Sequence, residues 1–140
     1  MKVLIITYYW PPAGGSGVQR WLKFVKYLPE FGVTPVVFTV ENPEYAVEDE
    51  SLQNEVADDV EVLRGKIWEP NQLLGKWGGK GKKVSAGFLD AKPGTKDRIL
   101  RFIRANYFIP DSRKFWIKPS VKLLTDYLKG KDFDAIITTG

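Results

Sequence analysis

An unbroken apolar run, rich in β-branched side chains, occupies residues 2–8 (KVLIITY). Such a run is typical of a strand that is buried on both faces of a parallel sheet. After a loop at residues 9–17, apolar side chains recur at helical spacing until Gly32, where a left-handed residue would end a helix. Residues 34–40 (TPVVFTV) predict a second strand, in which Pro35 is tolerated at the start. This segment therefore predicts a βαβ unit with parallel strands and a right-handed crossover. Its helical apolar positions are Val18, Trp21, Leu22, Val25 and Leu28.

The middle of the sequence predicts shorter elements. Residues 49–58 suit a short acidic helix, and residues 60–64 (VEVLR) alternate as a third strand would. Glycines interleaved with lysines break any period at residues 69–95, which predicts an insertion. Helical spacing then returns at residues 96–108.

The last part of the sequence predicts a helix and a fourth strand. The helix is expected to follow Pro119, with Val121, Leu124 and Leu128 on its buried side. Residues 134–139 (DAIITT) predict a parallel strand, and the carboxyl ends of such strands border the ligand crevice of an open α/β sheet. We therefore expect an α/β fold: a Rossmann-like open parallel sheet with helices on both faces. Because the sequence stops at Gly140, right after this strand, we expect a fragment of a longer protein.

Composition bounds both the size of the fold and the chemistry that it can support. With 140 residues and 44% hydrophobic side chains, the chain is long enough for a single sizeable core, so residues 1–140 are expected to form one domain. Cysteine and histidine are both absent, which excludes disulfides, thiolate metal sites and histidine bases, and no metal site is assigned. The apolar stretch after Met-Lys is too short for a signal peptide, so the cytoplasm is the expected location.

The charges are unevenly distributed. Residues 41–61 hold nine acidic and no basic side chains, whereas residues 76–104 hold nine Lys or Arg against two Asp. The basic segment could attract anionic lipid headgroups at the inner membrane face, where each cation contributes about 1 kcal/mol, or it could be a solvated helix side. Nucleic acid is not expected, since no recognised binding module accompanies the charge. The candidates for a membrane contact are Arg98, Arg101, Arg104, Lys82 and Lys83.

A glycine loop, Gly14-Gly15-Ser16-Gly17, separates the first strand from the first helix. Backbone N–H groups of the first helical turn favour an anion such as phosphate, although glycines can also serve only to turn the chain. No Gly-Lys-Ser/Thr follows, so this is not a P-loop. Arg20 stands where a dinucleotide fingerprint has its third glycine, and residues 9–13 separate strand from glycines. The position at the end of the first strand favours ligand binding.

Residues 8–39 (YYWPPAGGSGVQRWLKFVKYLPEFGVTPVVFT) resemble the opening of family 4 glycosyltransferases. The Pro110-Asp111-x-x-x-x-Trp116 segment and the closing Ile-Thr-Thr-Gly are similar to the same family. The resemblance implies a GT-B architecture, in which a first Rossmann-like domain binds the acceptor and a second domain binds the nucleotide sugar. Transfer would proceed with retention and without an essential metal or other cofactor. The loop at residues 14–17 would face the donor diphosphate, and a helix N-terminus can stabilise that leaving group.

The chain departs from the family by lacking the paired glutamates of the second domain and the histidine that follows the fourth strand. We therefore assign no catalytic residue and expect the chain alone to be inactive.

Five residues are candidates for binding the acceptor or a phosphate. Arg20 could reach a phosphate or carboxylate, or could lie on a solvated face. Trp10, with its two following prolines, could form a shelf for a sugar ring or a plug under the loop. Asp111 could accept a hydroxyl of the acceptor sugar, or could fix a turn with Trp116. The remaining two candidates are Thr139 and Gly140 at the crevice.

Two other classes of protein compete with the glycosyltransferase. One is a stand-alone module that binds a phosphorylated ligand, and the abrupt end after the fourth strand counts against it. The other is a nicotinamide-dependent oxidoreductase domain. The gap between strand and glycines and the presence of Arg20 count against that second alternative.

Overall fold

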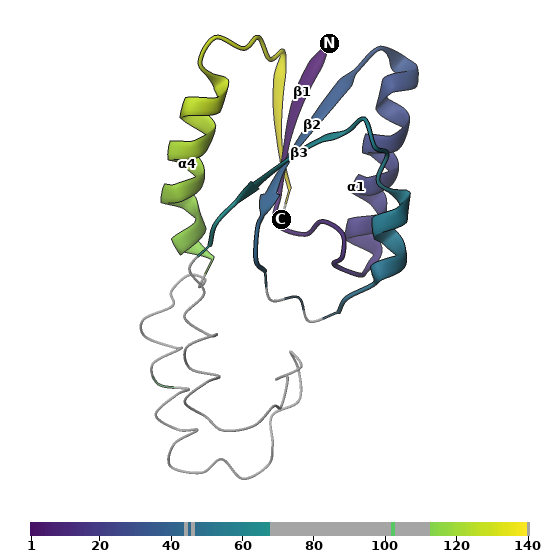
Figure 1. The fold of residues 1–140 in the computed structure, drawn as a ribbon, viewed down its shortest axis with the longest axis vertical. Coiled ribbons are helices and arrows are strands. Elements are labelled where there is room, and N and C mark those ends of the chain that lie inside the picture. Colours follow the sequence, from purple (N-terminus) through teal and green to yellow (C-terminus); the bar gives the residue numbers. More distant parts are fainter. Residues whose placement is uncertain (44, 46, 68–101, 103–112, 140) are drawn as a thin grey trace.

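The computed structural model describes residues 1–43, 45, 47–67, 102 and 113–139. Within them, four parallel strands form one sheet of order β3-β2-β1-β4 (Figure 1). The strands are β1 (Lys2–Thr7), β2 (Thr34–Val40), β3 (Glu61–Gly65) and β4 (Ala135–Thr139). Helices α1 (Ser16–Tyr27) and α4 (Lys114–Leu128) lie on opposite sides of the sheet. The predicted α/β fold, a Rossmann-like open parallel sheet, is confirmed.

Strand β1 is central and is buried on both faces, as its unbroken apolar run predicts. Leu4 and Ile5 are both 0% exposed, and they belong to separate hydrophobic clusters on the two sides of the sheet. Alternating side chains of a strand point to opposite faces, so each β1 residue serves one of the two layers. The central position explains why β1 carries no polar alternation.

Helix α1 covers one face of the sheet. Its buried residues Val18, Leu22 and Val25 recur at helical spacing and join the cluster that contains Val3 and Ile5. A short 3-10 helix, η1 (Leu28–Phe31), continues α1. Gly32 ends it with φ at 70°, which is the left-handed conformation expected from the sequence.

Helix α4 covers the other face. Its Trp116 ring stacks on Phe38 of β2, with the ring centroids 5.2 Å apart. Gly65 lies against this pair: a Cβ there would be 2.7 Å from Phe38 Cζ and 3.2 Å from Trp116 Nε1. The end of β3 therefore needs a glycine to leave room for the two stacked rings.

Two predictions about the last helix are wrong. The helix begins at Lys114 and contains Pro119, instead of starting after it. Packing of Trp116 on the sheet stabilises the upstream turn, and Pro119 removes only one intrahelical hydrogen bond. Val121 is 58% exposed, because the buried stripe set by Trp116 continues through Leu124 and Tyr127 and turns Val121 outward.

The remaining elements agree with the sequence or lie outside the described residues. The acidic helix is a 3-10 helix, η2 (Glu50–Glu55), whose first turn is capped by the Asp49 carboxylate accepting from the Ser51 N–H at 3.1 Å. The predicted third and fourth strands are β3 and β4. The insertion at residues 69–95 falls outside the described residues, as does the helix at 96–108 except for Phe102.

Tyr127 joins α4 to β3, because its hydroxyl donates to Glu61 Oε1 at 2.7 Å. Removal from water, together with this bond to the carboxylate, raises the pKa of Tyr127 to about 12. The phenol is harder to ionise in the folded chain than in the unfolded chain. Its contribution to stability is therefore present below about pH 10, the unfolded value, and is lost as the pH rises through about 12.

We expect phenolate absorbance to show a tyrosine titrating near pH 12 in the wild-type chain and missing in Tyr127→Phe. In Glu61→Gln the pKa of Tyr127 should move toward 10 without reaching it, since partial burial remains. An unchanged pKa of Tyr127 in Glu61→Gln would contradict this account.

Candidate functional site

A pocket of about 350 Å³ opens where β1 and β4 end, beside the start of α1. It is lined by residues 14–18, by Arg20 and Trp21 of α1, and by Thr7, Tyr9 and Thr139. The connection after β1 runs over one face of the sheet, whereas β4 is reached from the helix on the other face. The pocket therefore occupies the topological switch point, the usual ligand crevice of an open α/β sheet.

The glycines of the loop serve different needs. Gly14 is packed closely, because a Cβ there would lie 2.9 Å from Val47 Cγ1. Gly15 has φ at 112°, a conformation that side chains other than glycine rarely adopt. Gly17 has nothing within 4 Å of an added Cβ and leaves open space beside the pocket. The close packing of Gly14 and the positive φ of Gly15 thus explain why the turn needs glycine at these two positions. The turn does not require a glycine at position 17.

The start of α1 is suited to an anion. No side chain caps the helix, and its first turn contains no acidic residue. The first N–H groups of an α-helix have no intrahelical acceptor, and the helix dipole gives this end a partial positive charge. Ser16, Gly17 and Val18 of this turn line the pocket, so a phosphate there would meet free backbone donors.

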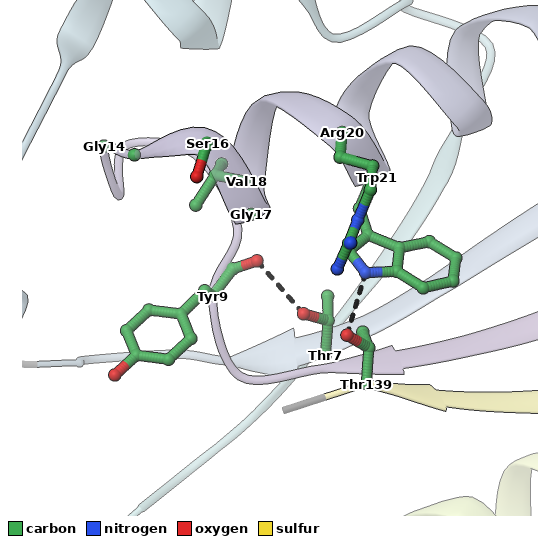
Figure 2. Close-up of a pocket in the computed structure, with 10 residues that line it drawn as sticks. Thr7, Tyr9, Gly14, Ser16, Gly17, Val18, Arg20, Trp21 and Thr139 are labelled. Carbon is green, nitrogen blue, oxygen red and sulfur yellow. Dashed lines mark hydrogen bonds between the residues drawn. The ribbon is translucent and has the colours of Figure 1, made fainter.

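Hydrogen bonds hold the strand ends in place below the helix (Figure 2). The Trp21 Nε1–H donates to Thr139 Oγ1 at 2.8 Å, and the Thr7 hydroxyl donates to the Tyr9 carbonyl at 3.1 Å. Thr139, a candidate from the sequence, is therefore part of the pocket and is positioned by α1. Sequence reasoning assigned Trp21 only to the core, although its place beside Arg20 could have indicated a second role.

Arg20 is the only charged side chain among the described residues that line the pocket. It is exposed on α1, and in Figure 2 its side chain extends from the helix toward the ends of the strands, where Thr7 and Thr139 lie. A guanidinium there adds a full positive charge to the partial charge of the helix. The structure thus brings together Arg20, Thr139 and the loop at residues 14–17.

Trp10 does not contribute to the pocket. Its side chain is 1% exposed and belongs to the cluster beneath α1, so the sugar shelf considered from the sequence is wrong and the core plug is confirmed. The loop turns tightly after it, with the Ala13 N–H donating to the Trp10 carbonyl at 3.0 Å. The Pro11–Pro12 peptide bond in this turn is cis.

An aromatic cluster braces the loop next to the pocket. The Arg113 guanidinium lies 4.4 Å from the ring centroid of Tyr8 and 4.9 Å from that of Tyr9, and it donates to the Tyr9 hydroxyl. The Tyr45 hydroxyl donates to the Tyr8 carbonyl at 3.1 Å, and burial raises the pKa of Tyr45. Sequence reasoning missed Tyr45 and Arg113, because no local pattern links them to the loop.

Several candidates lie outside the described residues. They are Asp111, Gly140, Arg98, Arg101, Arg104, Lys82 and Lys83. In the part of the chain that the structure describes, no group of three or more acidic side chains could hold a metal ion. No helix within the described ranges is both long enough and apolar enough to span a bilayer.

Comparison with known proteins adds no relative. No protein-family model matches the chain, and neither the curated proteins nor the solved structures contain a significant match. The fold and the pocket themselves define the class: an α/β protein with a Rossmann-like open parallel sheet and an anion-suited pocket at its switch point.

Proposed function

We propose that this chain is the acceptor-side domain of a retaining, metal-independent glycosyltransferase of GT-B architecture and family 4. A second domain would bind most of the nucleotide sugar, and the acceptor would be a glycan or a lipid-linked molecule at a cytoplasmic or membrane-peripheral location. The observation that carries the proposal is the pocket in which Arg20 and the uncapped start of α1 meet at the switch point.

The pocket suits the leaving group of such a reaction. In glycosyl transfer the bond between the anomeric carbon and the diphosphate oxygen breaks, and the acceptor oxygen forms the new bond and loses its proton. Negative charge develops on the departing nucleoside diphosphate. Fixed donors aimed at developing charge lower the barrier, and both backbone N–H groups and Arg20 can act in this way. This chemistry supports a role in stabilising the leaving diphosphate, and no described residue is assigned as the base.

The experiment is a screen of the complete protein for hydrolysis and transfer with UDP- and GDP-sugars. Loss of one charge-assisted hydrogen bond costs about 1.5–3 kcal/mol, so we expect Arg20→Ala to lower kcat/KM by roughly 10- to 100-fold. Lys122→Ala, at an exposed position on α4 across the sheet, removes the same charge type and should leave kcat/KM unchanged.

Absence of turnover with every donor would overturn the proposal. Retained binding of a phosphorylated ligand in that case would favour the non-catalytic module that binds such a ligand. Full activity of Arg20→Ala would remove Arg20 from the proposed mechanism.

A further inference from the structure

The outer face of α1 and η1 carries aromatic side chains that the sheet does not bury. Phe24 is 52% exposed, Tyr27 47% and Phe31 79%. They line a groove together with Arg20, Lys23 and Glu30. We name this groove and its rim the α1–η1 face. Large aromatic side chains gathered at such exposure indicate a surface that meets another apolar phase or partner.

These residues recur at helical spacing, so the outer side of α1 and η1 carries an aromatic stripe in addition to the apolar stripe that packs on the sheet. Val18, Leu22 and Val25 face the sheet, whereas Arg20, Phe24, Tyr27 and Phe31 recur every three or four positions on the side away from it. Trp21 packs edge-on against Phe24, with ring centroids 5.5 Å apart, and supports this ridge from the pocket side. The ridge therefore projects from a helix whose opposite side is packed against the sheet.

The charges around the ridge are predominantly basic. Arg20, Lys23 and Lys26 are exposed on α1, and Glu30 is the one carboxylate that lines the groove. Lys23 is paired with Glu55, and Glu30 offsets one of the two other cations, so Arg20 and Lys26 leave the face with a net positive charge that attracts an anionic surface. Helices that lie in the plane of an anionic lipid interface are held there by exposed aromatic side chains flanked by lysine and arginine. A protein partner would need an apolar patch ringed by acidic side chains at positions that match this face. An anionic bilayer offers negative headgroups and an apolar interior everywhere on its surface, so it needs no such match.

Arg20 also lines the pocket at the switch point, so the groove and the pocket share this residue. From these observations we propose that the α1–η1 face docks on an anionic lipid bilayer. A second part of this proposal rests on the proposed function. Because Arg20 is shared, the acceptor is a membrane lipid whose anionic headgroup lies at Arg20 and whose apolar part remains against the aromatic ridge. The residues of this face are not the basic ones at 82–104 that the sequence singled out, which lie outside the described residues.

The test is co-sedimentation of the complete protein with vesicles of phosphatidylcholine alone and of phosphatidylcholine mixed with phosphatidylglycerol. Each net positive charge near a charged surface contributes roughly a fivefold gain in partitioning, so Arg20 and Lys26 set against Glu30 predict about fivefold tighter binding to the mixed vesicles. Replacing Phe24 and Phe31 together by serine should weaken that binding by at least ~10-fold. Both side chains are exposed, so the fold should be unchanged by circular dichroism.

The matched control removes apolar side chains of similar exposure from the opposite side of the sheet. Ile117 and Val121 on α4 are 59% and 58% exposed, and their joint replacement by serine should leave vesicle binding unchanged. Absence of binding to mixed vesicles, or equal loss in the control, would overturn the proposal. Conversion of a dimer to a monomer by the Phe24/Phe31 variant, measured by light scattering, would overturn it in favour of a second copy of the chain.

Vesicle binding is measured without a donor, so it can fail or succeed independently of glycosyl transfer. The Phe24/Phe31 variant should still hydrolyse the nucleotide sugar in solution while losing transfer to vesicle lipid. Arg20→Gln should lower both hydrolysis and binding to the mixed vesicles, since Arg20 lines the pocket and the groove, and unchanged vesicle binding in this variant would overturn the placement of the headgroup at Arg20.

Discussion

Replacing Gly17 by tryptophan should lower nucleotide-sugar turnover by the complete protein at least ~100-fold and should leave the fold intact. Gly17 lines the pocket, and an added Cβ has nothing within 4 Å, so the backbone accepts a side chain there and we expect the indole to occupy space that the donor needs. An obstruction that shifts the diphosphate by about 1 Å from its productive position can cost about 100-fold in rate. Steady-state kinetics and chemical denaturation of the same preparation measure the two effects.

Gln19→Trp is the matched control, because Gln19 is exposed on the same helix and does not line the pocket. It should retain wild-type turnover. Gly15 is a poorer probe, since its φ of 112° makes any substitution strain the backbone and would combine loss of the site with loss of the fold. Wild-type activity in Gly17→Trp would show that the donor does not enter this pocket.

Trp10→Ala should reduce the free energy of unfolding by about 3–5 kcal/mol, a large share of the total for a domain of this size. Trp10 is 1% exposed and is among the largest fully buried side chains, so truncation leaves a cavity beneath the loop and α1. Urea denaturation followed by far-ultraviolet circular dichroism measures the change without relying on the removed fluorophore.

Phe31→Ala provides the comparison for Trp10→Ala. Phe31 is 79% exposed, so its truncation should change the free energy of unfolding by no more than ~0.5 kcal/mol. If Trp10→Ala proved as mild as Phe31→Ala, the plug beneath the loop would not be holding the pocket in shape.

Much of the fold could be predicted because the relevant signals are local. The unbroken apolar run of β1 predicted a strand buried on both faces, and the spacing of Val18, Leu22 and Val25 predicted α1. The start of α4 could not be obtained in this way. Pro119 is a local signal for a helix start, but contacts of Trp116 with a strand far away in the sequence outweigh it. The same contacts set the rotation of the helix and expose Val121.

The candidate site, like the fold, could be predicted only where the signals are local. The loop at residues 14–17, Arg20 and Thr139 could be placed together, because strand ends and helix starts meet at one edge of a parallel sheet. The side of the chain to which Trp10 turns depends on packing that no local pattern encodes. Arg113 reaches Tyr9 across 104 positions, so its role needed the structure. The resemblance to family 4 glycosyltransferases stays a prediction.

The pairing of β1 with β4 also determines when the pocket can exist during synthesis of the chain. The Lys2 N–H donates to a carboxylate oxygen of Asp134, which lies 132 positions later. Chains emerge and begin to fold from the N-terminus, and closing so long a loop costs entropy before its contacts form. The first βαβ unit can therefore assemble while the chain is still attached to the ribosome, before Thr139 meets Trp21. A nascent chain then presents its glycine loop with one wall missing, so ligand binding in this pocket becomes possible only after β4 has joined the sheet.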